Sequence, residues 1–270
     1  LDLTRPLSPH EVAAVHAGMD EFGVLVFHDQ KITDDQQLVF SRSLGPLEQA
    51  TGDIAAPEDR RVSMDLNDIS NLDKNNQILA RDDRRRLFGL GNQLWHSDSS
   101  FKEIPAKYSL LSARHIPPTG GNTEFADMRA AYDALDEAMK AHIADLKVHH
   151  SIAYSREVLG FEFNPAEKEQ LKGAVHPLVR TMRNGRKSLY LASHASSIVG
   201  WRLPEGRLLL RELMEHATQP RFVYQHQWRD GDLVIWDNRT TMHRARPFDD
   251  AKYRRELRRT TTLDLPLPVT

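Results

Sequence analysis

The sequence predicts a mainly β protein with flanking helices, of the jelly-roll or barrel type. Many short apolar or alternating segments are separated by turns that contain glycine, asparagine and proline. The few helical segments do not alternate with these strands, as they would in a sheet built from βαβ units. A parallel α/β fold is therefore the weaker alternative.

Length and composition indicate one globular unit. The chain has 270 residues, of which 40% are hydrophobic, and no repeat or linker divides it. We therefore predict a single domain over residues 1–270. The net charge of −2 favours no nucleic-acid partner, and no apolar run is long enough to span a membrane. With no secretory signal visible at the start, we expect a cytoplasmic protein.

Two helices and several strands are expected in the first half of the chain. Ser8-Pro9-His10-Glu11 is typical of a capping box and starts a helix that ends near Gly23. A second capping-box pattern at Thr33 predicts a second helix, and this helix ends at Gly45-Pro46. Strands are predicted at residues 24–27, 68–72, 108–113 and 122–125.

The second half continues with longer helices and further strands. Helical spacing over residues 128–146 indicates one amphipathic helix or a pair, and residues 148–154 are predicted to be extended. Residues 155–172 resemble a polar insertion over a sheet, for which a lid and a plain surface loop are both open interpretations. Asn184-Gly185 indicates a hairpin, and Pro204 opens a helix. Strands are predicted at residues 221–228, 233–236 and 254–265.

One short segment carries metal-binding chemistry. His96 and Asp98 are two residues apart, so in an extended segment their side chains leave the same face. An imidazole and a carboxylate are two-thirds of the facial triad of non-heme Fe(II) oxygenases. With 13 histidines and 38 acidic residues, about two such pairs arise by chance, so the pair alone is weak evidence. A second histidine, His243, comes just after the apolar strand predicted at residues 233–236.

The absence of cysteine leaves histidine and carboxylate as the available metal ligands. Close to the C-terminus, Arg255, Leu257 and Arg259 share one face of the predicted strand, and Arg254 and Arg258 share the other. An arginine held in a cavity near a metal binds a carboxylate through two hydrogen bonds, which suits a dicarboxylate.

These segments resemble the Fe(II)/2-oxoglutarate-dependent dioxygenases of the taurine dioxygenase superfamily, most of all the 2,4-dichlorophenoxyacetate dioxygenase group with its α-type relatives. The resemblance covers nearly the whole chain. It rests on residues 24–30, 95–101, 120–132, 216–219 and 236–239.

The resemblance implies a double-stranded β-helix (jelly-roll) core, Fe(II), the cosubstrate 2-oxoglutarate and O₂. It implies that the metal ligands are His96, Asp98 and His243. It implies that the far carboxylate of 2-oxoglutarate is held by Thr123 and Arg255, with Trp236 packed nearby. Arg259 is expected to contact either the metal-side carboxylate of the cosubstrate or the carboxylate of the substrate.

Four further positions are expected on the substrate side of the pocket: Asn92, His194, Gln77 and Ser197. Some relatives carry a lysine where Gln77 falls and a second histidine near Ser197, so this chain departs from their pattern there. Substrate recognition is accordingly less well defined by the resemblance than the iron and cosubstrate sites.

The function implied is hydroxylation of an aryloxyacetate such as 2,4-dichlorophenoxyacetate, with release of a phenol, glyoxylate, succinate and CO₂. The expected partner is a small aryl or sulfonate acid, and the enzyme is expected to form a homo-oligomer. A dioxygenase acting on taurine, another alkylsulfonate or another small carboxylate is the first alternative. A non-catalytic jelly-roll metal-binding protein is the second. A zinc hydrolase is less favoured, because no general base accompanies the triad.

Overall fold

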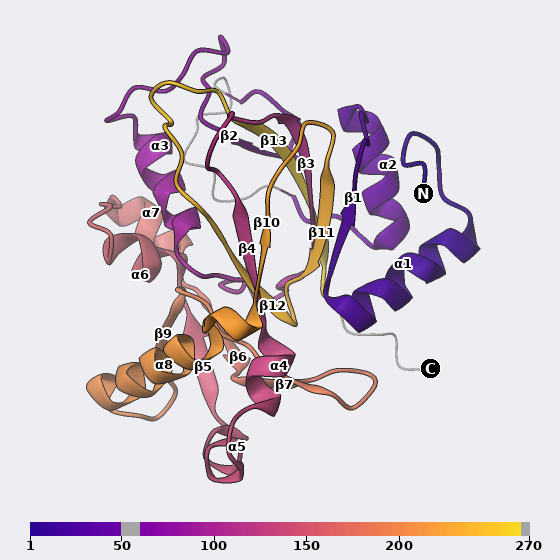
Figure 1. The fold of residues 1–270 in the computed structure, drawn as a ribbon. Coiled ribbons are helices and arrows are strands. Elements are labelled where there is room, and N and C mark those ends of the chain that lie inside the picture. The colour runs from indigo at the N-terminus through magenta and orange to yellow at the C-terminus, as the bar shows by residue number, and fades with distance from the viewer. Residues whose placement is uncertain (50–59, 266–270) are drawn as a thin grey trace.

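The computed structural model describes residues 1–49 and 60–265. Strands form the centre of the molecule and helices surround them (Figure 1). The largest sheet has the strand order β1-β11-β3-β13-β2. In that order its strands span Val24–Phe27, Leu233–Asp237, Ala106–His115, Glu256–Leu263 and Asn67–Ser70. The first strand of the chain therefore pairs with one of the last.

Three smaller sheets complete the β structure among the described residues. The sheet β10-β4-β12 consists of Val223–His226, Thr123–Asp127 and Thr241–Ala245. The sheet β6-β5-β9 consists of Ala174–Pro177, Lys147–His150 and Ala195–Ile198. The hairpin β7-β8 consists of Val179–Thr181 and Lys187–Leu189, on either side of the turn at Asn184-Gly185. Every pairing between described strands is antiparallel, which excludes the βαβ alternative there.

Helices α1 (Pro9–Phe22) and α2 (Asp34–Leu44) begin where the capping boxes predict. The Ser8 hydroxyl accepts the Glu11 N–H, and the Glu11 carboxylate accepts the Ser8 N–H at 2.8 Å. Helix α1 ends at Gly23, whose φ of 73° is the left-handed conformation that glycine adopts without strain. Both helices cover one face of the large sheet, where their apolar side chains pack against β3 and β11.

The remaining helices are shorter, apart from α8. They are α3 (Arg84–Gly89), α4 (Met128–Asp133), α5 (Glu137–Ile143), α6 (Ile152–Glu157), α7 (Pro165–Gln170) and α8 (Leu203–Ala217). Residues 128–146 therefore form a pair of helices, which was one of the two expected arrangements. None of the described helices is both long and apolar enough to cross a membrane.

A hydrophobic cluster lies between the large sheet and the sheet β10-β4-β12. It contains Phe125 of β4, Trp236 of β11 and Leu257 of β13, together with Trp228. All four side chains are at most 6% exposed. This cluster supports the strands from which the candidate site is built.

The structure corrects the sequence prediction in one place and extends it in another. Residues 148–154 are not extended throughout, because Ser151 caps a new helix by accepting the Tyr154 N–H at 3.2 Å. His243 comes just after β11, as predicted, and lies within the next strand, β12. That strand is short and follows a three-residue connection, so its alternation was not apparent from the sequence.

The polar insertion expected at residues 155–172 has an apolar anchor. Phe161 and Phe163 are buried, and their rings lie 5.5 and 6.3 Å from the ring of Phe88 in α3. The segment therefore packs on α3, and three of its seven charged residues lie in α7. The interpretation of this segment as a lid stays a prediction.

Candidate active site

A backbone bridge brings the two candidate histidine ligands together. The N–H of His96 donates to the carbonyl of His243 at 2.9 Å, and the N–H of His243 donates back to the carbonyl of His96 at 2.8 Å. Their rings consequently lie with centroids 4.1 Å apart. The extended conformation that the His-x-Asp spacing requires is thus present at His96.

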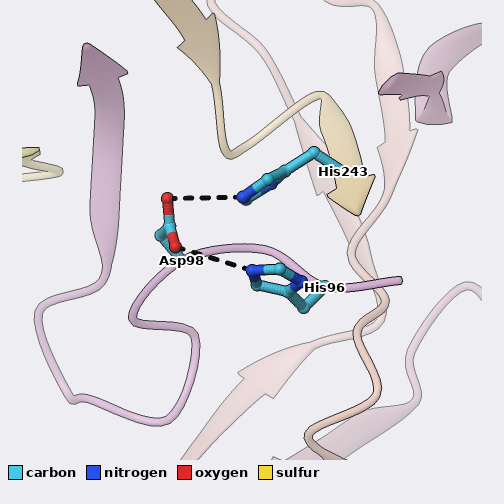
Figure 2. Close-up of side chains that lie close together, drawn as sticks. All are labelled: His96, Asp98 and His243. Carbon is cyan, nitrogen blue, oxygen red and sulfur yellow. Dashed lines mark ion pairs between the residues drawn. The ribbon is translucent and has the colours of Figure 1, made fainter. Parts of the chain in front are cut away.

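Asp98 completes the group of potential ligands (Figure 2). Its Oδ1 lies 3.8 Å from Nε2 of His96, and its Oδ2 lies 3.7 Å from Nε2 of His243. One ligand atom from each residue lies within 4.8 Å of the others, and all three side chains are buried. Two imidazoles and one carboxylate facing a common point are the donor set of a facial Fe(II) site.

Hydrogen bonding leaves the Nε2 atom of His96 free to bind a metal. Its Nδ1 lies 2.7 Å from the carbonyl of Leu94, which can only accept, so Nδ1 carries the proton and Nε2 carries the lone pair. Burial lowers the pKa of both His96 and His243, although the Asp98 carboxylate opposes this. The lowered pKa favours the neutral form of both rings, which metal ligation requires.

Three neighbours fix the position of Asp98, and the sequence did not show that they contact it. Ser109 donates to its Oδ2 at 2.7 Å, and Arg259 donates to its Oδ1 at 2.6 Å. The Asp98 N–H donates to Oδ1 of Asn238 at 3.0 Å, and Asn238 in turn donates to Ser109 at 2.9 Å. Burial raises the pKa of Asp98, but Arg259 and the two imidazoles outweigh it and hold that pKa below its usual range.

Trp236 lies directly beside one of the imidazoles. Its ring centroid is 4.5 Å from that of His243, and its Nε1 donates to Oδ1 of Asn238 at 3.1 Å. The ring of Phe125 stacks near the same histidine, at 6.1 Å. The two aromatic side chains thereby limit the orientations that His243 can adopt.

Arg255 is a buried cation that has no carboxylate partner among residues 1–49 and 60–265. Its Nη2 donates to the carbonyl of Gly121 at 3.2 Å, while its Nε is buried without a hydrogen bond. Burial lowers the pKa of Arg255 to about 10. An unpaired guanidinium in an apolar environment is costly, and a bound anion would remove this cost.

Thr123 presents a free hydroxyl hydrogen to the same cavity. Its Oγ1 accepts a hydrogen bond from Nε1 of Trp228 at 2.9 Å, which leaves the hydroxyl proton available to a further acceptor. Thr123 and Arg255 both line the cavity, so together they offer donors suited to a carboxylate.

The cavity has a volume of about 340 Å³ and gathers most of the residues that the sequence analysis named. These are the residues His96, Asp98, His243, Thr123, Trp236, Arg255, Arg259, Asn92 and His194. His194 is 2% exposed, and its ring centroid lies 6.0 Å from that of His96. The predicted ligands, cosubstrate contacts and two of the four substrate positions therefore share one cavity.

The structure does not bring Gln77 and Ser197 to this cavity. Gln77 is exposed in a turn, where its N–H donates to Oδ1 of Asp73 at 2.8 Å. Its neighbour Leu79 lines the cavity in its place. Ser197 lies in β9 opposite His149 and is only partly buried.

Ser109, Asn238 and Arg156 are site residues that sequence reasoning missed. Ser109 and Asn238 support Asp98, and Arg156 of α6 lines the cavity. Asn238 falls within a segment on which the resemblance rests, so a signal existed for it. Ser109 and Arg156 carried none, because only the pairing of distant segments places them here.

Comparisons with known proteins agree with this geometry. The model of the family described as "Taurine catabolism dioxygenase TauD, TfdA family" matches residues 1–261. The chain is 46% identical to the alpha-ketoglutarate-dependent 2,4-dichlorophenoxyacetate dioxygenase of Cupriavidus pinatubonensis, over 98% of this chain and 92% of that protein. It is 39% identical to the (S)-phenoxypropionate/alpha-ketoglutarate-dioxygenase of Sphingobium herbicidovorans, over 85% of this chain and 78% of that protein.

A solved structure gives the same result. The crystal structure of AAD-2 in complex with Mn(II) and N-oxalylglycine superimposes with a TM-score of 0.95. The two chains are 56% identical, and the match covers 97% of this chain and 92% of that one.

Proposed function

We propose that this chain, which belongs to the taurine catabolism dioxygenase TauD, TfdA family, is an Fe(II)- and 2-oxoglutarate-dependent dioxygenase that hydroxylates an aryloxyacetate such as 2,4-dichlorophenoxyacetate. One observation carries the proposal. The buried triad of His96, Asp98 and His243 shares its cavity with Arg255, a buried guanidinium without a carboxylate partner in the described chain.

In this proposal His96, Asp98 and His243 hold the iron through their Nε2 atoms and a carboxylate oxygen. Fe(II), 2-oxoglutarate and O₂ supply the oxidising chemistry when bound, and succinate and CO₂ are formed. The protein holds the ligands in place: the Leu94 carbonyl fixes the tautomer of His96, and Ser109 and Asn238 fix the orientation of Asp98.

The cosubstrate contacts follow from the unpaired donors. Arg255 and Thr123 bind the far carboxylate of 2-oxoglutarate, supported by their burial and their unused hydrogen-bond donors. Trp236 packs beside the metal site, as its contact with His243 indicates. Arg259 donates to Asp98 and would lie next to the metal-side carboxylate of the bound cosubstrate.

The reaction proposed inserts one oxygen atom of O₂ into the C–H bond next to the ether oxygen. The other oxygen atom enters succinate as 2-oxoglutarate loses CO₂. The hydroxylated product is a hemiacetal, which breaks its carbon–oxygen bond to give a phenol and glyoxylate. The named function of the 46% identical relative supports this choice of substrate.

We further propose that the antiparallel sheets form a double-stranded β-helix (jelly roll) and that residues 1–270 are one domain. The antiparallel pairings and the family match over residues 1–261 support both statements. A homo-oligomer and a cytoplasmic location complete the proposal. Gel filtration with light scattering and fractionation of cells would test these two points.

Product analysis tests the function directly. The enzyme is incubated with Fe(II), 2-oxoglutarate and O₂ and either an aryloxyacetate or an alkylsulfonate such as taurine. We expect phenol, glyoxylate and succinate in equal amounts from the aryloxyacetate. Succinate release that depends on the sulfonate alone would instead identify the alkylsulfonate alternative. Failure of 2-oxoglutarate to bind the anaerobic Fe(II) protein would indicate a non-catalytic protein.

A further inference from the structure

Arg156, in α6, is a second buried guanidinium in the cavity. It is 4% exposed, and all its hydrogen-bond acceptors are uncharged. Its Nε donates to the carbonyl of Phe88 at 2.9 Å, its Nη1 to Oγ of Ser155 at 3.3 Å, and its Nη2 to Oδ1 of Asn92 at 3.3 Å. Within the described ranges no carboxylate lies at ion-pair distance from it.

Five of the other arginines that line the cavity are neutralised by acids, and Arg60, which has no acid partner among the described residues, is only partly buried. The pairs are Arg61 with Asp68, Arg85 with Asp83, Arg86 with Asp250, Arg246 with Glu124, and Arg259 with Asp98. Arg255 is unpaired like Arg156, and its anion is supplied by the cosubstrate in the proposed function. Arg156 therefore has a charge for which the proposed function has not yet provided a partner.

The backbone leaves space for this guanidinium. A Cβ atom on Gly91 would lie 2.1 Å from Cζ of Arg156, so any larger residue there would displace the arginine head group. Glycine is thus needed at position 91 for Arg156 to occupy its place, although the backbone of Gly91 is in an ordinary helical conformation.

Arg156 also lies close to the metal ligands. Its neighbour Ser155 contacts Nδ1 of His194 at 2.9 Å, and the His194 ring lies 6.0 Å from that of His96. Its charge lowers the pKa of both histidines, in addition to the larger effect of burial. Burial also lowers the pKa of Arg156 itself, to about 10.

The surroundings of Arg156 suit an aromatic acid. Its guanidinium lies 4.7 Å from the centre of the Phe88 ring, and Phe101 packs against His194 with ring centroids 5.1 Å apart. Phe88, Phe101 and Ile152 all line the cavity. This part of the cavity therefore combines one unpaired cation with apolar surface for a ring.

We propose that Arg156 binds the carboxylate of the aryloxyacetate substrate and so determines the preference for an acid. The assignment rests on the proposed function. In an aryloxyacetate the carbon that reacts is bonded directly to the carboxylate, so the cation that holds this group must lie near the metal ligands. Arg259 is already occupied by Asp98, whereas Arg156 is not.

The test compares an aryloxyacetate with its uncharged amide in wild type and Arg156→Gln. For the acid we expect KM to rise about tenfold or more, because a charge-assisted hydrogen bond is lost. The KM of the amide and the anaerobic binding of 2-oxoglutarate to the Fe(II) enzyme should stay within about twofold of wild type. The preference for acid over amide should therefore collapse.

Two further variants separate recognition from structure. Gly91→Ala should raise the KM of the acid by displacing the arginine, and it keeps the proposal testable if Arg156→Gln does not fold. Arg84→Gln, which removes a charge paired with Glu167 outside the cavity, should leave every KM unchanged. Thermal unfolding of each variant monitors the contact between α6 and α3.

Several results would overturn the assignment. Equal effects on acid and amide would show that Arg156 is only a structural residue, and an unchanged KM for the acid would place the carboxylate elsewhere. If wild type binds 2-oxoglutarate but oxidises no aryloxyacetate, the proposed function fails first and the assignment fails with it.

Discussion

At the scale of single residues, the site depends on which atoms are left without partners. Nε2 of His96 is free because Nδ1 is used by the Leu94 carbonyl, and Nε of Arg255 has no hydrogen-bond partner among the described residues. Unused polar atoms in a buried position are unfavourable in the empty protein. The same atoms are the ones that a metal and a dicarboxylate would satisfy.

Replacing His96 by alanine removes one of three ligands without touching the backbone bridge. We expect iron affinity and product formation to fall by more than about 100-fold, since loss of an outer partner alone costs 10- to 100-fold. Equilibrium dialysis of Fe(II) and phenol release measure the two effects. His10→Ala, at an exposed position in α1, should behave as wild type. Full iron-dependent activity in His96→Ala would refute the ligand assignment.

His150 makes the fold sensitive to acid. It is fully buried, its Nε2 has no partner among the described residues, and burial lowers its pKa to about 3. In the unfolded chain His150 has a pKa near 6.5, so there it takes up a proton at a higher pH than in the folded protein. The free energy of unfolding therefore decreases as the pH falls from about 6.5 to about 3. Above pH 6.5 the contribution of His150 is fully present.

His150→Leu should therefore lose less stability in acid than wild type. Its unfolding free energy, measured in urea at several pH values, should fall less steeply by up to about 1.4 kcal/mol per pH unit. Parallel profiles for the two proteins would show that other groups govern the acid sensitivity.

At the scale of elements, α2 is joined to the large sheet by a buried amide. Gln37 is 0% exposed; its Nε2 donates to the carbonyls of Leu110 and Arg258, and its Oε1 accepts the hydroxyl of Ser112 at 2.6 Å. The side chain therefore connects the helix to β3 and β13, the two strands with Ser109 and Arg259.

Gln37→Leu should destabilise the protein by about 1–3 kcal/mol, because the Ser112 hydroxyl and the carbonyls lose a buried partner. Denaturant unfolding measures the change. The control is Val39→Thr, on the exposed side of the same helix, which should change stability by less than about 0.5 kcal/mol. An equally small effect of Gln37→Leu would mean that water replaces the amide.

Local signals explain which elements could be predicted. Capping at Ser8 and Thr33 and the turn at Asn184-Gly185 involve residues that are adjacent in sequence, and these predictions are confirmed. Helix α6 is started by a single serine cap directly after a strand. The extended pattern of the preceding residues led to the prediction of a strand there.

The site residues divide in the same way, into those with a local sequence signal and those without one. The spacing of His96 and Asp98 was visible in the sequence, and the resemblance placed Thr123 and Arg255 in the cavity. Ser109 and Arg156 reach the site only through strand pairing and helix packing, which have no local pattern. Gln77 was assigned from the resemblance to the family, and its turn carries it away from the cavity.

At the scale of the whole molecule, the site joins segments from all parts of the chain. The ligands come from residues 96–98 and from β12, while the candidate cosubstrate contacts come from β4 and from Arg255, the residue that precedes β13. Ligands that bind only the folded state therefore stabilise contacts between segments that are far apart in the sequence.

We accordingly expect Mn(II) and 2-oxoglutarate together to raise the unfolding temperature more than Mn(II) alone. At a hundredfold excess over Kd, a ligand contributes about 2.7 kcal/mol. Arg255→Leu should keep the shift due to the metal and lose the added shift due to 2-oxoglutarate, as measured by calorimetry. An added shift of wild-type size in this variant would show that the far carboxylate binds elsewhere.

The contact between Trp236 and His243 has an optical consequence. Three of the four tryptophans adjoin the site: Trp236 beside His243, Trp228 bonded to Thr123, and Trp95 next to His96 in the chain. Indole emission is quenched by nearby transition metals, so the protein contains its own fluorescent reporter of metal loading. Filling of the centre can thus be followed in real time without a label, and Trp201, which packs against His142, provides an internal reference.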